Sequence, residues 1–393
     1  MKVLLLGVGM QGKAALHDLL QSEQVSEVIA ADRDLKALIA HVEERGYGRK
    51  VRCESVDAQS PKSISRLMEQ GPDVVIDLLP SVFCGTVAAV AVERQIHLVN
   101  AFYAGPQVKN LAEMAETRNV TILPEFGMDP GIDLVLLGEA VRSLDIVEEI
   151  FSYGAGFPEP DAADNPIKYK VTWTFEGVLK SYRRAGRVIR NGKTVDVKES
   201  QMFSPENIHE IEIEGLGKLE AIPNGDALKY ANLLGIEQSG LRHMGRYSLR
   251  WPGHCAFWKT IVGLHLLDDE PVIVNGVAVD RRRFLAAAIE PHIQYGPLER
   301  DVVVVRVEVR GRKDGKHTRA VYQVIDRRDL KTGFTSMSRT VGYTASIGAL
   351  MIGNGKIAKR GVLSPVNDIP YKAFAQELGK RNIQVTSEHT ACQ

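Results

Sequence analysis

The amino-acid sequence predicts an α/β protein in which a doubly wound parallel sheet is followed by a second, α+β domain with a mainly antiparallel sheet. Three observations predict this class. Over residues 1–125, short apolar runs alternate with amphipathic helical stretches. A glycine-rich turn joins the first apolar run to the first helical stretch. After Pro124 the pattern changes to polar–apolar alternation with Asn-Gly turns, which is typical of antiparallel hairpins.

Strands and helices are expected in strict alternation over the first 125 residues. The expected strands are 3–6, 28–31, 51–56, 74–79, 97–100 and 120–123. The expected helices lie near 12–21, 34–45, 61–70, 84–94 and 106–118. The strands are continuously apolar, which indicates a parallel sheet with helices on both faces.

The second domain is expected at residues 126–335. Antiparallel strands are predicted within 148–175, 187–222 and 271–278, and the clearest hairpin joins 301–309 to 319–324. Small residues along 336–352 predict a tightly packed helix. We expect this helix and the tail near 370–380 to return to the first domain, so that the chain divides into 1–125, 126–335 and 336–393.

The composition is that of a soluble, cytoplasmic globular protein. The 393 residues include 49 Lys+Arg and 49 Asp+Glu, and this zero formal charge argues against nucleic-acid and anionic-membrane partners. No apolar run approaches the roughly 18 residues of a membrane span. The four cysteines, Cys53, Cys84, Cys255 and Cys392, form no Cys-x-x-Cys pair. This predicts a reducing compartment without a disulfide framework, and no metal site.

The glycine-rich turn is a candidate dinucleotide site of the Rossmann type. Gly7-Val8-Gly9-Met10-Gln11-Gly12 lies between the first strand and the first helix, and Asp32 ends the second strand. Gly7 permits the tight turn, Gly9 lets a pyrophosphate approach the backbone, and Gly12 lets the helix pack on the strand. The helix N-terminus at Met10 and Gln11 offers N–H groups to the anion. A strand–helix turn without a ligand is the alternative.

Asp32 is expected to accept hydrogen bonds from the adenosine ribose and to repel a 2′-phosphate, which favours NAD. Arg33 can pair with that phosphate, so NADP stays possible. Ligands bind at the carboxyl ends of parallel strands, so two more segments are expected at the cofactor. These segments are Asp57-Ala58, beside the adenine, and Leu79-Pro80-Ser81, on the nicotinamide side.

The sequence resembles the saccharopine dehydrogenase family, and most closely its glutamate-forming reductases. The most specific matches are Glu125–Asp133 and Asp164–Trp173. Further matches lie at residues 79–83, 100–103, 177–179, 223–226 and 249–254. The resemblance implies a Rossmann domain, an α+β substrate domain and often a homodimer. It also implies NAD(P)-dependent oxidation of the CH–NH bond of a lysine-derived amine, saccharopine, as small-molecule substrate.

Two departures from the family pattern keep alternatives open. Family reductases carry an Asn-Arg-Asp motif whose arginine pairs with a substrate carboxylate, but this chain has Asn224-Gly225-Asp226. The Arg250–His254 segment is similar to that of lysine 6-dehydrogenases, which deaminate lysine directly and usually lack the Asp129–Asp133 run. The alternatives are therefore L-lysine 6-dehydrogenase and a non-catalytic nucleotide-binding relative.

Three residues are candidates for the base that helps water attack the imine: Asp129, Lys170 and His254. Asp129, beside a Pro-Gly turn, is expected to face the cleft between the domains and to hold the substrate nitrogen, or to cap the helix near Ile132. Lys170 is a base if desolvated, and otherwise a solvated strand lysine. His254 is either a titrating group or a buried histidine bonded to a carbonyl.

Four residues are candidates for substrate binding. Arg250 offers a fork of donors that suits an α-carboxylate, with a surface ion pair as the alternative. Tyr103, at the end of the fifth strand, would orient the substrate or pack at the domain junction. Tyr169 and Trp173 are expected on one face of a strand, with Lys170 on the other face.

Overall fold

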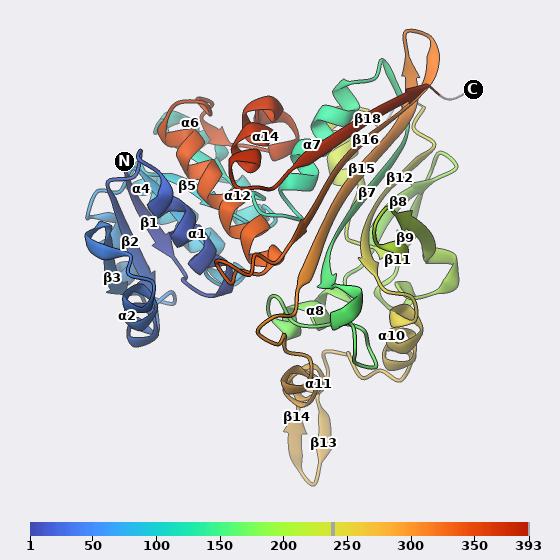
Figure 1. Cartoon of the computed structure of the whole chain (residues 1–393), viewed down its shortest axis with the longest axis horizontal. Coiled ribbons are helices and arrows are strands. Elements are labelled where there is room, and N and C mark those ends of the chain that lie inside the picture. The colour runs from blue at the N-terminus through green and yellow to red at the C-terminus, as the bar shows by residue number, and fades with distance from the viewer. Residues whose placement is uncertain (237–239, 392–393) are drawn as a thin grey trace. The chain divides into compact units, whose positions relative to one another are not determined.

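The computed structural model describes residues 1–236 and 240–391 and divides the chain into two compact units (Figure 1). Unit 1 consists of Met1–Gly138 and Ser338–Val385, and unit 2 consists of Glu139–Met337 and the residues from Thr386 onwards. The domain limits expected from the sequence stay a prediction. Cys392 lies outside the described residues. Among the described residues, no helix is long and apolar enough to cross a membrane.

Unit 1 is built on a seven-stranded sheet with the order β17-β6-β5-β4-β1-β2-β3, and its strand pairs are parallel. The strands are β1 (Lys2–Leu6), β2 (Glu27–Asp32), β3 (Val51–Ser55), β4 (Val74–Asp77), β5 (His97–Asn100), β6 (Thr121–Leu123) and β17 (Gly361–Val362). The side chains of the central strands β1 and β4 are almost completely buried, as a sheet covered on both faces requires. The predicted doubly wound sheet is confirmed, and β17 is an additional edge strand.

Helices cover both faces of this sheet (Figure 1). They are α1 (Met10–Gln21), α2 (Leu35–Glu44), α3 (Pro61–Met68), α4 (Cys84–Glu93), α5 (Pro106–Lys109), α6 (Ala112–Thr117), α12 (Ser336–Gly353), α13 (Pro365–Asp368) and α14 (Tyr371–Lys380). The single helix expected at 106–118 is two short helices. Helix α12 packs closely on α1, because a Cβ on Gly342 would lie 2.8 Å from the Ala15 nitrogen.

Unit 2 contains a nine-stranded mixed sheet with the main order β10-β11-β12-β7-β15-β16-β18, to which β8 and β9 add beside β12. The strands are β7 (Ile146–Pro158), β8 (Gly186–Arg190), β9 (Lys193–Val197), β10 (His209–Ile213), β11 (Gly217–Pro223), β12 (His243–Arg250), β15 (Asp301–Lys313), β16 (Lys316–Arg327) and β18 (Val385–Ala391). Strand β12 runs parallel to β7, and β15 is antiparallel to both β7 and β16. The α+β architecture with a mainly antiparallel sheet is confirmed.

The predicted hairpins are present in unit 2. Asn191-Gly192 joins β8 to β9, and Asn275-Gly276 joins β13 (Val272–Val274) to β14 (Val277–Val279). Asn191 and Asn275 have φ of 50°, the left-handed region that such turns require. The helices of this unit are α8 (Phe175–Ser181), α9 (Leu228–Leu234), α10 (His254–Gly263) and α11 (Arg281–Ile289), while α7 (Ile132–Arg142) begins in unit 1. Short 3-10 helices occur at Gly48–Lys50, Ser81–Phe83, Pro160–Ala162, Glu199–Gln201, Pro205–Asn207 and Glu290–His292.

The strand expected around Tyr169–Trp173 is wrong, because β7 ends at Pro158 and the chain is irregular until α8 begins at Phe175. The side chain of Asn165 gives the physical reason. Its Nδ2 donates to the Tyr169 carbonyl (2.8 Å), and its Oδ1 accepts from the Tyr169 N–H (3.3 Å). One amide side chain thus satisfies the backbone groups that a neighbouring strand would otherwise satisfy.

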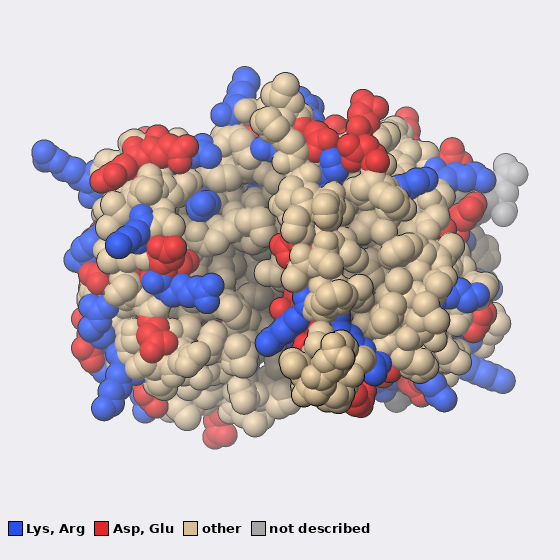
Figure 2. Space-filling model, turned by 90° about the horizontal axis from the view of Figure 1, so that it is seen from below, with Lys and Arg blue, Asp and Glu red and all other residues tan. Residues whose placement is uncertain are grey.

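Charged side chains of both signs are interspersed on the face drawn in Figure 2, where blue and red atoms lie next to each other. This distribution agrees with the equal numbers of basic and acidic residues in the sequence.

Candidate active site

The glycine-rich turn of unit 1 has the geometry of a dinucleotide cradle. Gly7 has φ +86°, and a Cβ there would lie 2.7 Å from the Leu78 carbonyl oxygen. A Cβ on Gly12 would collide with the Gly7 carbonyl oxygen. By contrast, a Cβ on Gly9 would meet no atom within 4 Å. The turn is therefore closed on the protein side at Gly7 and Gly12 and open at Gly9, where a ligand needs room.

Helix α1 begins at this open space. Gly9 is its N-cap residue, no side chain caps it, and Met10 follows with 44% of its surface exposed. Gln11 lies in the same first turn, half-buried. A helix N-terminus next to an open glycine turn provides backbone N–H groups and positive potential for a pyrophosphate. These residues fit a dinucleotide.

Asp32 and Arg33 lie at the carboxyl end of β2. The carboxylate of Asp32 accepts the N–H of Val8 (Oδ2, 2.7 Å) and of Asp34 (Oδ1, 3.1 Å). It therefore holds the glycine-rich turn against β2. Arg33 is exposed, and no carboxylate of the described residues forms an ion pair with it. This end of β2 thus presents one anchored carboxylate and one guanidinium open to a ligand.

The other two expected cofactor segments follow β3 and β4, at the same edge of the sheet. Asp57 accepts the Gln59 N–H, and Ala58 packs on the hydrophobic core of unit 1. Leu79 is buried, while Pro80 and Ser81 are exposed. Asp77 lies below this turn and accepts the Leu79 N–H at 3.1 Å. Its complete burial raises the pKa of its carboxyl group to about 7.

The structure brings Tyr103 and Asp129 together in unit 1. The Tyr103 hydroxyl lies 3.4 Å from Oδ1 of Asp129, and both side chains are partly accessible. At the start of α7, the backbone N–H groups of Ile132 and Asp133 bond to the carbonyls of Gly127 and Met128. The Asp133 carboxylate accepts the Gly131 N–H at 2.8 Å. Backbone carbonyls and the Asp133 carboxylate therefore contribute to the start of α7, and the capping role considered for Asp129 stays a prediction.

Arg250 is a buried cation in unit 2. It ends β12, and only 6% of its surface is exposed. Its Nε donates to the Tyr182 hydroxyl (3.2 Å) and its Nη1 to the Leu249 carbonyl (2.7 Å). Among the described residues no carboxylate lies within ion-pair distance of its guanidinium, so the surface ion pair considered from the sequence is absent there. Glu220 pairs with Arg250 in register, but its carboxylate instead accepts the N–H groups of Gly253 and Cys255.

His254 begins α10 and is buried. Its Nδ1 lies 2.8 Å from the Ile167 carbonyl, and its Nε2 lies 2.7 Å from the Tyr182 hydroxyl. Burial and the nearby Arg250 lower the pKa of His254 to about 3. It is therefore a neutral histidine bonded on both nitrogens, which corresponds to the structural alternative rather than to a base.

Lys170 is buried and held by two carboxylates. Its Nζ lies 2.7 Å from Oε1 of Glu299 and 3.0 Å from Oδ1 of Asp164. Burial alone would lower the pKa of Lys170, but the hydrogen bonds to Glu299 and Asp164 raise it above its ordinary value. In this arrangement Lys170 is a protonated partner of two acids, which opposes a role as base.

Two aromatic residues expected at the substrate lie around this part of unit 2. Tyr169 is buried, and the Arg250 guanidinium carbon lies 5.3 Å from its ring centroid. Its hydroxyl and that of Tyr295 are buried without a hydrogen-bond partner among the described residues. Trp173 is half-buried and packs on the same hydrophobic cluster. The Tyr169 hydroxyl, buried without a hydrogen-bond partner among the described residues in a side chain that packs on the Arg250 guanidinium, is an expected feature of a polar ligand site.

Tyr182, Tyr295 and Glu299 are the residues that sequence reasoning missed here. Tyr182 follows α8 in a segment without a distinctive motif, and Glu299 lies 129 residues from Lys170. Asp164 belongs to a segment singled out by the resemblance, which was the one available signal.

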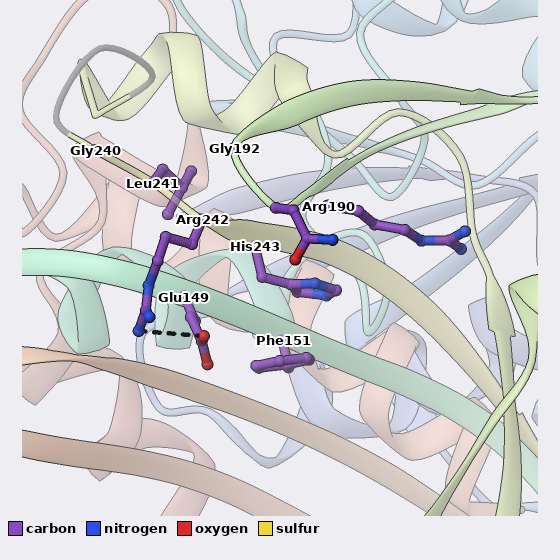
Figure 3. Close-up of a pocket in the computed structure, with 9 residues that line it drawn as sticks. Glu149, Phe151, Arg190, Gly192, Gly240, Leu241, Arg242 and His243 are labelled. Carbon is purple, nitrogen blue, oxygen red and sulfur yellow. Dashed lines mark ion pairs between the residues drawn. The ribbon is translucent and has the colours of Figure 1, made fainter.

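A separate cavity of about 720 Å³ also lies in unit 2 (Figure 3). Glu149, Phe151, Arg190, Arg242 and His243 are among its lining residues. Arg242 and Glu149 form an ion pair across one wall at 3.4 Å. None of the residues predicted for the site lines this cavity, so it adds nothing to the candidate active site.

Comparison with known proteins shows similarity along nearly the whole chain. The chain is 25% identical to the mitochondrial alpha-aminoadipic semialdehyde synthase of Bos taurus, over 99% of this chain and 48% of that protein. It therefore spans about half the length of that relative. It is 24% identical to saccharopine dehydrogenase [NADP(+), L-glutamate-forming] of Saccharomyces cerevisiae, over 96% of this chain and 97% of the yeast protein.

The fold is also that of a solved structure. The apo saccharopine dehydrogenase (L-Glu forming) from Saccharomyces cerevisiae superposes with a TM-score of 0.86 at 23% identity, covering 99% of this chain and 100% of the other. Residues 3–123 match the family model described as the saccharopine dehydrogenase NADP binding domain, and residues 127–383 match the saccharopine dehydrogenase C-terminal domain. With these matches the expectation from the sequence is confirmed: the chain belongs to the saccharopine dehydrogenase family.

Proposed function

We propose that this protein is a saccharopine dehydrogenase of the L-glutamate-forming type, an oxidoreductase of the CH–NH bond. In the proposed reaction, saccharopine, NAD(P)+ and water give L-glutamate, aminoadipate semialdehyde, NAD(P)H and a proton. The names of the relatives and the family models support this substrate. The observation that carries the proposal is the buried guanidinium of Arg250 without a protein carboxylate, because an amino-acid substrate supplies the missing anion.

The roles of the residues follow from their geometry. Gly9 and the N-terminus of α1 bind the pyrophosphate of the cofactor. The nicotinamide of the bound cofactor accepts a hydride from the amine carbon of the substrate. Arg250 holds a substrate carboxylate. Asp129 receives the proton of the attacking water at Oδ1 or Oδ2, with the Tyr103 hydroxyl orienting the carboxylate. We assign this role to Asp129 because the other two candidates are engaged: His254 is bonded on both nitrogens, and Lys170 is paired with two carboxylates.

We propose NADP as the preferred cofactor, in place of the NAD preference that Asp32 alone suggests. Two observations support NADP. The relatives and the N-terminal family model are named for it, and Arg33 offers an exposed guanidinium at the end of β2. Asp32 already accepts two backbone N–H groups, which partly compensate its negative charge.

Direct deamination of lysine is the second candidate. Gly225 favours it, because the family motif has at this position an arginine that pairs with a substrate carboxylate, and this chain has no side chain there. A substrate with one carboxylate needs fewer guanidinium groups than saccharopine. A cytoplasmic homodimer, as the sequence suggests, is part of the proposal and is testable by light scattering.

One assay tests these proposals together. Reduced-nicotinamide absorbance is measured with saccharopine and with lysine, each with NAD+ and with NADP+. The expected result is turnover of saccharopine with NADP+ as the better cofactor. Turnover of lysine but not of saccharopine would contradict the proposed substrate and support direct deamination of lysine. Tight cofactor binding without turnover of either compound would contradict the enzyme assignment and support a non-catalytic relative.

A further inference from the structure

Unit 2 contains a chain of hydrogen bonds that ends on the Arg250 guanidinium. It runs from the Ile167 carbonyl through His254 and the Tyr182 hydroxyl to Nε of Arg250, with distances of 2.8, 2.7 and 3.2 Å. Tyr182 and His254 each have 1% of their surface exposed. The three side chains come from the end of β12, the start of α10 and the residue after α8.

The direction of each hydrogen bond follows from donor and acceptor chemistry. A carbonyl only accepts, so Nδ1 of His254 carries the proton. A neutral imidazole then accepts at Nε2, so the Tyr182 hydroxyl donates its proton to His254. The oxygen of Tyr182 thereby presents its lone pairs to Arg250 and accepts from Nε. No alternative donor pattern satisfies all three contacts while the imidazole is neutral.

The two side chains that hold Nε of Arg250, the Tyr182 hydroxyl and the His254 imidazole, are both uncharged. A carboxylate in the place of Tyr182 would orient Arg250 but would also neutralise it. A phenol hydroxyl held by a neutral imidazole orients the guanidinium and leaves its charge for a ligand. Nε and Nη1 are bonded within the protein, and Nη2 has no hydrogen-bond partner among the described residues.

We propose that Tyr182 and His254 are positioning residues that hold Arg250 as an uncompensated receptor for a carboxylate of the substrate. The identity of that carboxylate rests on the proposed function, but anion binding by Arg250 does not require turnover. Preorganised donors bind a charged ligand without the cost of reorganisation, so loss of the Tyr182 hydroxyl should weaken binding more than it slows the reaction step.

The test uses the full-length protein, with L-saccharopine for kinetics and glutarate for calorimetric binding. Tyr182→Phe should raise the KM for saccharopine and the Kd for glutarate by about 10- to 100-fold, with a much smaller change in kcat. In an Arg250→Lys background, which lacks the Nε donor, Tyr182→Phe should cause little further increase in the KM for saccharopine or the Kd for glutarate. His254→Leu should resemble Tyr182→Phe, and His254→Gln, which keeps an acceptor for the hydroxyl, should partly restore binding.

Tyr153 provides a matched control, because its hydroxyl also bonds a histidine, His209, at 3.0 Å. Tyr153 lies in β7, the strand beside the β12 strand that carries Arg250, and it does not bond Arg250. Tyr153→Phe should lower the melting temperature without changing the KM or the Kd. Equal effects of both Tyr→Phe substitutions on melting temperature, with an unchanged Kd in each, would overturn the proposal. So would an undiminished effect of Tyr182→Phe in the Arg250→Lys background.

Failure of the proposed function gives a different result. One such outcome is that saccharopine does not react while glutarate binding still depends on Arg250 and Tyr182. That result would support the positioning of Arg250 by Tyr182 and would refute the proposed reaction. If saccharopine is turned over while Tyr182→Phe leaves KM unchanged, the reaction stands and the positioning role is refuted. If Tyr182→Phe does not fold, the comparison of His254→Leu with His254→Gln carries the test.

Discussion

The Tyr103 hydroxyl and the Asp129 carboxylate lie 3.4 Å apart, although they are 26 residues apart in sequence and follow different strands. A phenol next to a carboxylate donates a hydrogen bond to it and thereby restrains its orientation. The pair therefore presents an oriented acceptor at the edge of the parallel sheet of unit 1, where ligands of such sheets bind.

Replacement of Asp129 tests this pair. Asp129→Asn should lower kcat by about 10²- to 10⁴-fold, the usual contribution of a general base, because the amide cannot take a proton from water. Tyr103→Phe should have a smaller effect, since it removes the orientation but not the base. Both are measured by steady-state kinetics, with NADPH affinity as the control. An Asp129→Asn enzyme with nearly full kcat would exclude Asp129 as the base.

Lys170 provides a second kinetic test. Its contacts with Glu299 and Asp164 keep it protonated, so Lys170→Arg should preserve the charge and reduce kcat by less than about 10²-fold, below the usual contribution of a general base. The pH profile of kcat/KM should keep its shape. A complete loss of activity in a folded Lys170→Arg protein would instead identify Lys170 as the proton acceptor.

Arg250→Met separates binding from stability. The substitution removes a buried cation that has no protein counter-ion, so the melting temperature should stay constant or rise. The KM for saccharopine should increase by about 30- to 5,000-fold, which corresponds to the cost of about 2–5 kcal/mol for removing one partner of a buried charge pair. A large loss of stability would show that the guanidinium is mainly structural.

The pH dependence of stability follows from His254. Its pKa is lowered to about 3 in the folded protein by burial and by Arg250, compared with 6.5 in the unfolded chain. Between these values the unfolded state binds a proton that the folded state does not. Stability from this residue is therefore complete above pH 6.5 and falls by about 1.4 kcal/mol per pH unit as the pH drops towards 3.

Denaturant unfolding at pH 7, 6, 5 and 4 measures this slope. His254→Gln should reduce the slope but not abolish it, because burial also lowers the pKa of other histidines such as His243, while substitution of the exposed His317 should leave the slope as in the parent protein. Identical slopes in the parent and in His254→Gln would show that the histidine is not buried neutral.

The exposed guanidinium of Arg33 is expected to bind the 2′-phosphate of NADP. Arg33→Ala should weaken NADPH binding by about 10-fold or more and leave NADH affinity nearly constant, because only NADPH carries the 2′-phosphate. Fluorescence titration with NADPH and with NADH gives the ratio of the two Kd values. An equal loss for both cofactors would place Arg33 elsewhere on the nucleotide, and no loss would remove it from the site.

Sequence patterns were sufficient for the parallel sheet and its glycine-rich turn. The strands of unit 1 are short apolar runs, and burial on both faces makes such runs recognisable without knowledge of their partners. The contact of Gly12 with the Gly7 carbonyl is local, whereas Gly7 approaches the backbone of Leu78, which follows β4 and lies far away in the sequence. Hairpins with Asn-Gly turns were predictable for the same local reason.

The residues of unit 2 that we propose for the substrate depend on contacts that local patterns do not contain. Tyr169–Trp173 alternates like a strand, but the Asn165 side chain bonds the Tyr169 backbone and an irregular segment results. Lys170 is paired by Glu299, 129 residues away, and this contact changes it from a possible base to a fixed cation.

Arg250 and His254 were identifiable as candidates from their residue types alone, whereas their protonation states and partners were not. A guanidinium, an imidazole and a phenol acquire their function from which groups surround them after folding. Burial removes water as an alternative partner, so each remaining neighbour strongly affects charge and orientation. Local sequence thus accounts for the backbone framework and the glycine-rich turn, while long-range packing establishes which charged and neutral groups surround Lys170, Arg250 and His254.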